Sequence, residues 1–435
     1  MMQFDPLIAV YAVPLLVIWI VYLGRRKWVD ARNLVVRADA IEAGLTQPAS
    51  LHPKIDPTRC LGCGACARAC PEGDVLGLVN GKAELLAPAE CIGHGACRAA
   101  CPHGAITLVF GTETRGVEIP HVGPDFQTNV PGVFIAGELG GMGLIRNAIE
   151  QGRQAVDTIR RLDGLRSPDC LDVVIIGGGP AGISASLAAI EHKLRFITVE
   201  QDSFGGTVAH FPRGKLVMTQ PATLPIIGKV AFREISKEKL LEFWHEAARK
   251  TGLKIRYGER VDAIHHNGQV IEVKTTRGSY LARTVLLAIG RRGTPRRLEV
   301  PGEDASKVVY RLTDPAQYRG KHVLVVGGGD SALEAASSIA DERGTTVTLS
   351  YRSESFARAK LKNRERVAKA ERDGRLKLML QSTVEQVDPD SVALTWKGQP
   401  LALRNDAVIV CAGGILPTGL LKSIGVEVGT KYGTA

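Results

Sequence analysis

The sequence predicts an α/β protein with two Rossmann-like dinucleotide-binding domains, a small α+β domain and an N-terminal transmembrane helix. Three observations predict this organisation: two glycine-rich turns that each follow a buried strand, two runs of closely spaced cysteines, and one apolar run at the N-terminus. A chain of 435 residues corresponds to roughly two to four domains, at about 100–200 residues each. The hydrophobic content of 45% is typical of globular packing.

The first element is the apolar run LIAVYAVPLLVIWIVYL, from Leu7 to Leu23, which basic residues follow at positions 25–27. The run is slightly shorter than the roughly twenty residues that span a bilayer. Basic residues after such a run place the rest of the chain in the cytoplasm. We therefore expect residues 1–27 to be a single-pass anchor in the cytoplasmic membrane, and residues 28–52 to be a polar linker. A buried or amphipathic docking helix is the alternative.

Two cysteine runs follow, and seven of the nine cysteines lie in them. Both have the pattern C-x2-C-x2-C-x3-C-P, except that histidine stands at the second position of the second run. Their members are Cys60, Cys63, Cys66 and Cys70, then Cys91, His94, Cys97 and Cys101. This spacing is typical of iron–sulfur binding, in which the fourth cysteine of a run reaches the other cluster. Zinc is the alternative, although zinc sites rarely use the Cys-Pro ending.

On these runs, residues 53–110 resemble the two-cluster bacterial ferredoxins, which have a small α+β fold. The resemblance implies two iron–sulfur clusters, both of the 4Fe-4S type in that family. It assigns one to Cys60, Cys63, Cys66 and Cys101, and the other to Cys91, Cys97 and Cys70.

His94 stands where the ferredoxin family has cysteine, and three interpretations stay open. His94 is the fourth ligand of a 4Fe-4S cluster, or it is unbound beside a 3Fe-4S cluster, or it faces solvent beside a labile iron. We favour ligation, because imidazole can ligate iron; a neutral ligand in place of thiolate generally raises the reduction potential.

The first glycine-rich unit is LDVVIIGGGPAGISASLAAIEHKLRFITVE, residues 171–200. A buried strand is followed by Gly177, Gly179 and Gly182, then a helix and a second strand that ends at Glu200. The first glycine permits a tight turn, the second lets the backbone approach a pyrophosphate, and the third lets the helix pack on the strand. Glu200 can accept hydrogen bonds from a ribose hydroxyl. The unit therefore predicts a dinucleotide site; an unrelated glycine-rich turn is the alternative.

A second unit begins with the strand from His322 to Val326 and continues GGGDSALEAASSI. Its fingerprint residues are Gly327, Gly329 and Ala332. The next strand ends at Tyr351-Arg352 rather than at an acid, and Arg358 lies beyond. Because arginine can hold a 2′-phosphate, we expect NADPH rather than NADH at this site. The alternatives are NADH as the donor and Arg352 as a solvated surface charge.

The segment TNVPGVFIAGE, residues 128–138, resembles the second flavin fingerprint of two-dinucleotide flavoproteins. An apolar strand precedes Gly137-Glu138, and in that family an aspartate at the Glu138 position contacts the ribityl chain of the flavin. A helix from about Leu144 to Ile159 resembles the helix beside the isoalloxazine ring. In the family this segment comes last, whereas here it precedes the first glycine-rich unit. We therefore expect a circularly permuted flavoprotein; a chance match in a linker is the alternative.

Residues 111–435 together resemble the thioredoxin-reductase-like flavoproteins of the pyridine nucleotide-disulfide oxidoreductase superfamily. The motifs that carry the resemblance are IIGGGPAG, LLAIGRRGTPRRLEVPGED, VVGGGDSALEAA and AVIVCAGGILPTGLLKSIGVEV. It implies FAD in the first unit and NAD(P)H in the second. The expected parts are a permuted piece of the FAD domain at 111–165, the FAD domain at 166–290, the NAD(P) domain at 291–405 and a return to the FAD domain at 406–435.

Thioredoxin reductases carry a redox Cys-x-x-Cys just before the second glycine-rich helix, where this chain has Gly328-Gly329-Asp330. Cys170 and Cys411 stand alone beside apolar strands, which favours core positions. Family members without the cysteine pair include ferredoxin–NADP reductases and bacillithiol disulfide reductases.

The stretch SFGGTVAHFPRGK, residues 203–215, occupies the region that approaches the flavin in this family. Gly205 and Gly206 would let the backbone contact the ring. His210 is the candidate catalytic residue for proton handling, with a structural hydrogen-bonded histidine as the alternative.

These observations predict a membrane-tethered, FAD-dependent NAD(P)H oxidoreductase that passes electrons between NADPH, FAD and iron–sulfur clusters. The expected partner is a redox protein or a small electron acceptor, and electron flow in reverse is equally compatible. A homodimer is among the expected assemblies, and nothing resembles a nucleic-acid module. The net charge of +10 suggests an acidic partner or anionic lipid. Alternatives are a disulfide or quinone reductase that uses the clusters as a relay, and a non-catalytic membrane redox sensor.

Overall fold

The computed structural model describes residues 6–48, 51–141, 143–211, 213–218, 221–230, 235–291, 293–356 and 359–434. They form two compact units, which meet in sequence between Val109 and Phe110.

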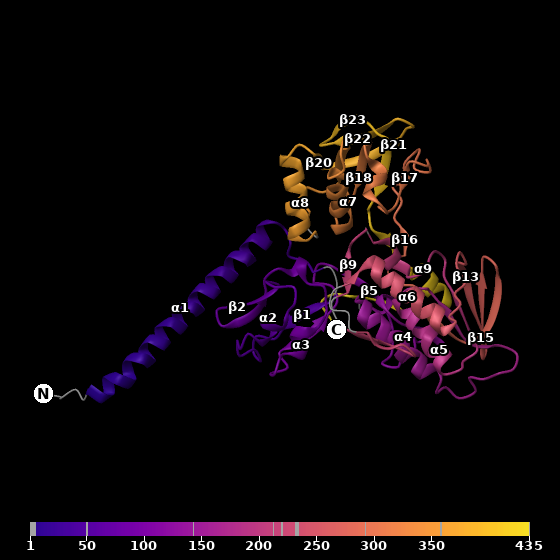
Figure 1. The fold of residues 1–435 in the computed structure, drawn as a ribbon, viewed down its shortest axis with the longest axis horizontal. Coiled ribbons are helices and arrows are strands. Elements are labelled where there is room, and N and C mark those ends of the chain that lie inside the picture. The colour runs from indigo at the N-terminus through magenta and orange to yellow at the C-terminus, as the bar shows by residue number, and fades with distance from the viewer. Residues whose placement is uncertain are drawn as a thin grey trace. The chain divides into compact units, whose positions relative to one another are not determined.

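The N-terminal unit begins with α1 (Pro6–Glu42), a single continuous helix (Figure 1). Among the described residues, no helix is long and apolar enough to cross a membrane. The apolar run is shorter than the roughly twenty residues that a bilayer core requires, and charged residues follow it from position 25. The expected single-pass anchor at residues 1–27, and the membrane location with it, are therefore wrong.

The second half of α1 is not the expected linker, because it docks on the strands β2 (Leu76–Val79) and β3 (Lys82–Leu85). Asn33 is buried and donates from Nδ2 to the Leu78 carbonyl oxygen at 2.8 Å. Arg37 and Glu84 pair at 2.6 Å across the same contact. An exposed ion pair contributes little, so the buried amide bond is the contact that orients the helix.

The cysteine core of this unit lies between two small antiparallel pairs, β2 with β3 and β1 with β4. The remaining elements are β1 (His52–Ile55), α2 (Ala65–Ala69), η1 (Pro88–Glu90), α3 (Ala96–Ala99) and β4 (Ile106–Val109). Cys60, Cys66, Cys91 and Cys97 are buried together with Val75, Leu76 and Ile106. The cysteines therefore form much of the core that holds these short elements together.

The first sheet of the C-terminal unit has the order β13-β14-β15-β7-β8, with β6 also paired to β15. Its strands are β6 (Val133–Ile135), β7 (Leu171–Ile176), β8 (Phe196–Val199), β13 (Val261–Asn267), β14 (Val270–Thr275) and β15 (Gly278–Leu287). The long strand β15 pairs with β14 antiparallel at its start and with β6 parallel at its end. Its other edge pairs with β7. The strand expected from the permuted segment thus lies in the same sheet as Leu171–Ile176.

Helices α4 (Ile145–Ile159) and α5 (Pro180–Glu191) cover one face of this sheet, and α9 (Thr418–Ile424) covers part of the other. Strand β5 (Val117–Pro120) pairs with β26 (Val428–Lys431), so the two ends of the unit lie side by side. A separate apolar cluster forms around α6 (Lys237–Thr251). The short elements of this part are η2 (Glu138–Gly140), η3 (Gly206–His210), β9 (Leu216–Met218), β10 (Ala222–Leu224), β11 (Gly228–Val230) and β12 (Ile235–Ser236).

The second sheet of this unit is wholly parallel, in the order β17-β24-β18-β19-β20. Its strands are β17 (Val308–Val309), β18 (His322–Val326), β19 (Thr346–Tyr351), β20 (Leu376–Leu380) and β24 (Ala407–Val410). One face packs on η4 (Pro315–Tyr318), α7 (Asp330–Ala340) and α8 (Leu361–Arg372); the other packs on β21 (Ser382–Val387), β22 (Ser391–Trp396) and β23 (Gln399–Arg404). Strands β16 (Thr294–Pro295) and β25 (Gly414–Ile415) pair with each other. They lie where the chain enters and where it leaves the part that contains the second sheet.

We predict that Gly152→Ala destabilises the C-terminal unit by about 1–3 kcal/mol, as overpacked cores do. Gly152 lies in α4, and a Cβ there would be 2.1 Å from the Ala181 carbonyl oxygen of α5. The matched control is Gly419→Ala in α9, where a Cβ meets nothing within 4 Å. It should be neutral or stabilising. Thermal unfolding of both holoproteins tests the pair, and equal effects would contradict the packing argument.

Candidate cofactor sites

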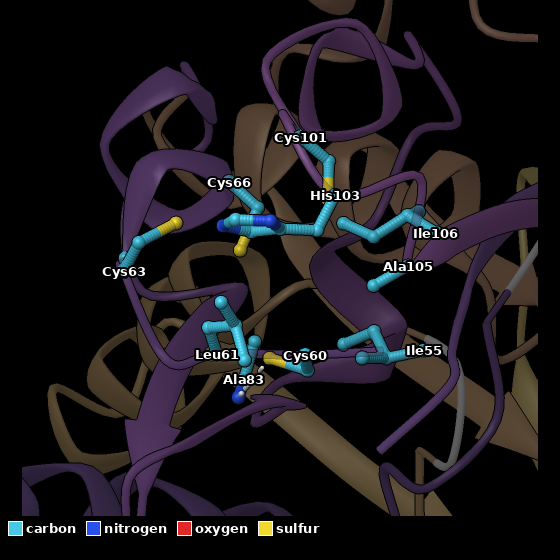
Figure 2. A pocket seen from close by; sticks show the side chains of 11 residues that line it. Ile55, Cys60, Leu61, Cys63, Cys66, Ala83, Cys101, His103, Ala105 and Ile106 are labelled. Atoms are coloured by element: carbon cyan, nitrogen blue, oxygen red, sulfur yellow. Dashed lines mark hydrogen bonds between the residues drawn. The ribbon is translucent and has the colours of Figure 1, made fainter. Parts of the chain in front are cut away.

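The first cluster site is a small pocket in the N-terminal unit. Its walls include all four cysteines that the resemblance assigns to one cluster: Cys60, Cys63, Cys66 and Cys101. Figure 2 shows their side chains around the pocket, with the ring of His103 among them. The cysteines come from both runs and surround a volume, which fits a cluster that takes one cysteine per iron. Among the described residues, no three His, Cys, Asp or Glu side chains form a single-ion site.

The loop that carries Cys60 is fixed by the β2–β3 turn. The Ala83 N–H donates to Cys60 Sγ at 3.4 Å, and Lys82 Nζ donates to the Cys60 carbonyl oxygen at 2.6 Å. Gly62 has φ +68, and a Cβ there would lie 2.0 Å from the Gly81 carbonyl oxygen. Hydrogen bonds to cluster sulfurs tune the reduction potential, so this strand both positions and tunes the first site.

The second cluster site gathers Cys70, Cys91 and Cys97. Burial raises the pKa of the Cys97 thiol to about 11, together with the charges of the nearby Cys91, Cys70 and Cys66. Burial also raises the pKa of Cys91, with added contributions from Cys70 and Glu72. Cys70 packs against the apolar cluster that contains the buried Cys91 and Cys97, so the three cysteines lie close together as the resemblance implies. Iron binding must displace their protons, because only thiolates ligate.

His94 lies in the second site, with Nε2 3.9 Å from Cys70 Sγ. Its Nδ1 accepts the backbone N–H of Ala96 at 3.3 Å. Burial lowers the pKa of the imidazole, while the charge of Glu72 opposes that shift. The ring is therefore held in the site with Nε2 toward a ligand sulfur.

The first glycine-rich turn is shaped to admit a dinucleotide backbone. Gly177 has φ +114, and a Cβ there would lie 2.4 Å from the Ala288 carbonyl oxygen. A Cβ on Gly182 would lie 1.8 Å from the Gly177 carbonyl oxygen, so no larger residue fits. Gly179 is the N-cap of α5, whose free N–H groups form an anion site. The residues present therefore fit the pyrophosphate of FAD.

Glu200 is held against this turn in a buried position. Its Oε2 accepts the Gly178 N–H at 2.6 Å, and its Oε1 accepts the Asp202 N–H at 2.8 Å. Each carboxylate oxygen keeps a lone pair, which leaves Glu200 able to accept from a ribose hydroxyl. Gly205 and Gly206 close on the same turn, because the Gly205 N–H donates to the Gly178 carbonyl oxygen at 2.9 Å.

The permuted segment brings Gly137 to the first turn of α5. Gly137 has φ +85, and a Cβ there would lie 3.0 Å from the Ala181 Cβ. Its N–H donates to Gln151 Oε1 of α4 at 2.8 Å. Glu138 follows in an exposed position, and α4 begins shortly after. The strand, the turn and the helix that the flavin fingerprint requires therefore lie beside Gly177–Gly182.

The half-buried cation Arg291 lies near this segment and was missed by the sequence analysis. Its Nη2 donates to the Glu118 carbonyl oxygen at 2.7 Å. Burial lowers the pKa of the guanidinium, while the charges of Glu138 and Glu118 raise it. The only signal in the sequence is its place directly after the crossover Ala288–Gly290.

The second glycine-rich turn has the same arrangement as the first, except that a tyrosine stands where the first site has Glu200. Gly327 has φ +144, Gly329 is the N-cap of α7, and the Ala332 Cβ lies 3.1 Å from the position of a Cβ on Gly327. The pairs Ile176↔Val199 and Val326↔Ser350 precede the two turns. Tyr351 therefore occupies the position that Glu200 holds in the first site.

The ring of Tyr351 lies over the second turn, where a Cβ on Gly328 would be 2.3 Å from it. It stacks on Phe356 with ring centroids 5.6 Å apart. Arg352 follows and is exposed; this fits a contact with a 2′-phosphate and a solvated surface charge equally, so its role stays a prediction. Arg358, the other predicted phosphate ligand, lies outside the described residues.

These sites match known protein families. Residues 174–433 match the model described as pyridine nucleotide-disulphide oxidoreductase, and residues 52–102 match the 4Fe-4S dicluster domain. The chain belongs to the pyridine nucleotide-disulphide oxidoreductase family. It is an FAD-dependent NAD(P)H oxidoreductase that carries an N-terminal 4Fe-4S dicluster domain.

The matches to individual relatives cover most of the length of each relative. The ferredoxin–NADP reductase of Ignicoccus hospitalis is 29% identical over 269 residues, which are 60% of this chain and 83% of the relative. That of Thermus thermophilus is 30% identical over 269 residues, 59% of this chain and 77% of the relative. The solved bacillithiol disulfide reductase of Staphylococcus aureus has a TM-score of 0.51 and 23% identity, over 59% of this chain and 80% of that chain. The last likeness shows the fold.

His210, the candidate catalytic residue of this oxidoreductase, lies at the end of η3. Its Nε2 is 2.9 Å from Asp202 Oδ2, and Arg311 Nη1 is 3.2 Å from the same oxygen. The contacts with Asp202 fit the structural alternative, and the role in proton handling stays a prediction.

We predict that Cys101→Ser and Cys70→Ser each remove the cluster of the other run. Cys101 lines the pocket of Cys60, Cys63 and Cys66, so its loss should abolish the first cluster and leave the second. Cys70→Ser should do the reverse. EPR of the oxidised and of the reduced holoproteins distinguishes the two clusters. Loss of the same signal in both variants would contradict the crossed ligand sets.

We predict that Gly137→Val yields protein depleted in FAD. A side chain there is strained by the positive φ and pushes on Ala181 at the first turn of α5. The control is Gly140→Val in the same segment, where the nearest atom to a Cβ is 3.9 Å away. Flavin absorbance per protein gives the measurement. Full flavin in Gly137→Val would show that the permuted segment does not complete the FAD site.

Proposed function

We propose that this oxidoreductase exchanges electrons between NADPH and a one-electron redox partner, through FAD and the two clusters. The carrying observation is the way the chain joins its two units. Val109 ends the last strand of the dicluster domain, and Phe110, the next residue, packs on Gly141. Gly141 directly follows the Glu138–Gly140 turn of the FAD site. The dicluster domain is thus joined in sequence, with no intervening linker, to a residue that packs on the segment completing the flavin site.

The electron count agrees with this order of carriers. FAD accepts a hydride, two electrons and one proton, from NADPH and can release those electrons one at a time. Each iron–sulfur cluster accepts one electron, so two clusters match one hydride. NADPH leaves as NADP⁺. With a low-potential donor the same chain can run in reverse and form NADPH.

The protein supplies positioning rather than a nucleophile. Gly177–Gly182 and Glu200 hold the dinucleotide, and Gly137 with α4 supports the flavin side. Arg291 supplies a half-buried positive charge near Glu138. In the dicluster domain, the Ala83 N–H bond to Cys60 Sγ tunes the first cluster.

A thiol or disulfide reductase is the second candidate, and the remaining cysteines argue against it. Cys170 is buried beside β7, and Cys411 is half-buried beside β24. They belong to different sheets, whereas a redox dithiol needs Cα atoms within about 7 Å.

A quinone reductase needs an apolar substrate pocket. A non-catalytic sensor would show no sustained NADPH oxidation with any artificial acceptor.

Anaerobic titration of the holoprotein with NADPH, followed by absorbance and EPR, tests the proposal. We expect the flavin to bleach first and the EPR signals of the clusters to change next. In Cys101→Ser the flavin should still bleach, while the first cluster's signal is lost. Clusters that stay oxidised under NADPH, although dithionite reduces them, would overturn the proposed electron path.

We predict that Arg352→Ala weakens NADPH binding about tenfold or more and leaves NADH binding nearly unchanged. A lost charge-assisted contact to the 2′-phosphate is worth about 1.5–3 kcal/mol. The control is Arg343→Ala, an exposed arginine near the opposite end of β19. Flavin reduction rates at varied NADPH and NADH give both affinities. Equal weakening for both nucleotides would mean that Arg352 does not contact the phosphate.

A further inference from the structure

We infer that His94 is not an iron ligand but donates a hydrogen bond from Nε2 to the sulfur of Cys70, which leaves the second cluster with three protein ligands. The inference rests on the proposed clusters and concerns only the composition of the second one. Its evidence is the hydrogen bonding of the His94 ring and the equivalence of the two cysteine runs.

The loop around His94 repeats the loop around Cys63. In the first run, α2 begins after Gly64 at φ +70; in the second, α3 begins after Gly95 at φ +74. His94 therefore occupies in the second run the position that Cys63 has in the first. By the same equivalence, Cys70 belongs to the site of His94 as Cys101 belongs to the site of Cys63, each coming from the other run. Cys63 lines the first pocket together with Cys101, so the equivalence puts His94 at the edge of the second cluster.

The backbone fixes which ring nitrogen of His94 carries the proton. Nδ1 accepts the Ala96 N–H at 3.3 Å, and the direction of a backbone N–H is set by the chain. An accepting nitrogen must keep its lone pair, and a neutral imidazole has one proton. The proton is therefore on Nε2, the nitrogen that lies 3.9 Å from Cys70 Sγ.

Ligation through Nε2 would need the opposite tautomer. A metal-bound histidine normally donates its other ring N–H to a carboxylate, a carbonyl or water. Here that other nitrogen faces a backbone donor, so an Nδ1–H would meet the Ala96 N–H head-on. As a donor, in contrast, His94 satisfies both ring nitrogens: Nδ1 accepts from Ala96 and Nε2 gives its proton to the Cys70 sulfur. This assignment replaces the ligation that the sequence favours.

The second cluster then has only Cys70, Cys91 and Cys97 as protein ligands. Three thiolates suit a three-iron cluster, whereas the first site keeps four cysteines and a four-iron cluster. The expected content is about seven irons per FAD. The N–H bond to sulfur should also raise the potential of the second cluster.

The composition of anaerobically purified holoprotein tests the inference without any turnover. We expect about seven irons per FAD and, in the oxidised protein, the EPR signal of one three-iron cluster. Eight irons in wild type with no three-iron signal, falling to seven in His94→Ala, would overturn it. Added Fe(II) with a reductant gives a further reading. Conversion to a four-iron cluster in wild type but not in His94→Ala would show that His94 ligates; equal behaviour of both supports the inference.

Three variants separate a donor from a ligand. His94→Ala should keep the three-iron signal and lower the midpoint potential of that cluster, whereas a ligand's loss would change the iron count. His94→Cys should gain an iron and lose the signal. His103→Ala is the matched control, since His103 lines the first pocket, and it should leave the second signal unchanged. These readouts do not depend on NADPH, so failure of the proposed electron path would leave them intact.

Discussion

The parallel pairing of β15 with both β6 and β7 is the constraint on which the flavin site depends. The pairs Val285↔Val133 and Val285↔Val174 set one register for three strands that come from distant parts of the chain. Because a register shift of one residue would reverse every side chain, this pairing also fixes where the turns after β6 and β7 end. It brings Gly137 and Gly177 to the same edge of the sheet, where parallel strands place their ligands.

Glycines let the helices that follow those strands pack closely on each other and on the glycine-rich turn. Gly152 of α4 faces the Ala181 carbonyl oxygen, and Gly182 faces the Gly177 carbonyl oxygen. Both contacts are closer than any side chain permits, so the packing of α4, α5 and the turn depends on these two positions together. The pairing of β5 with β26 completes the unit. The dicluster domain ends at Val109, and the C-terminal unit begins at Phe110. The dicluster domain therefore interrupts neither the sheet nor the helix pair.

The sequence was most informative where function demands a fixed residue type at a fixed spacing. The cysteine runs, the glycine-rich turns and the strand at 133–136 follow from local rules, and the structure has the corresponding elements. The helix α1 was misjudged, because its second half is held by Asn33 on β2, a contact 45 positions away that no periodicity reveals. His103, Arg291 and Tyr351 were missed or undervalued for the same reason: each acquires its place from another element of the fold.

The two cluster sites differ in ways that bear on the order of carriers. The residue after the Cys-Pro ending is Glu72 in one run and His103 in the other. Glu72 acts on Cys70 and Cys91, whereas His103 lines the first pocket. Cluster type, hydrogen bonds to the sulfurs and nearby charges set the reduction potential of such a cluster. The His94 hydrogen bond makes the second cluster easier to reduce, and Glu72 opposes this effect. If the hydrogen bond outweighs the single acid, the four-cysteine cluster is the intermediate carrier and the second cluster is the one that meets the partner.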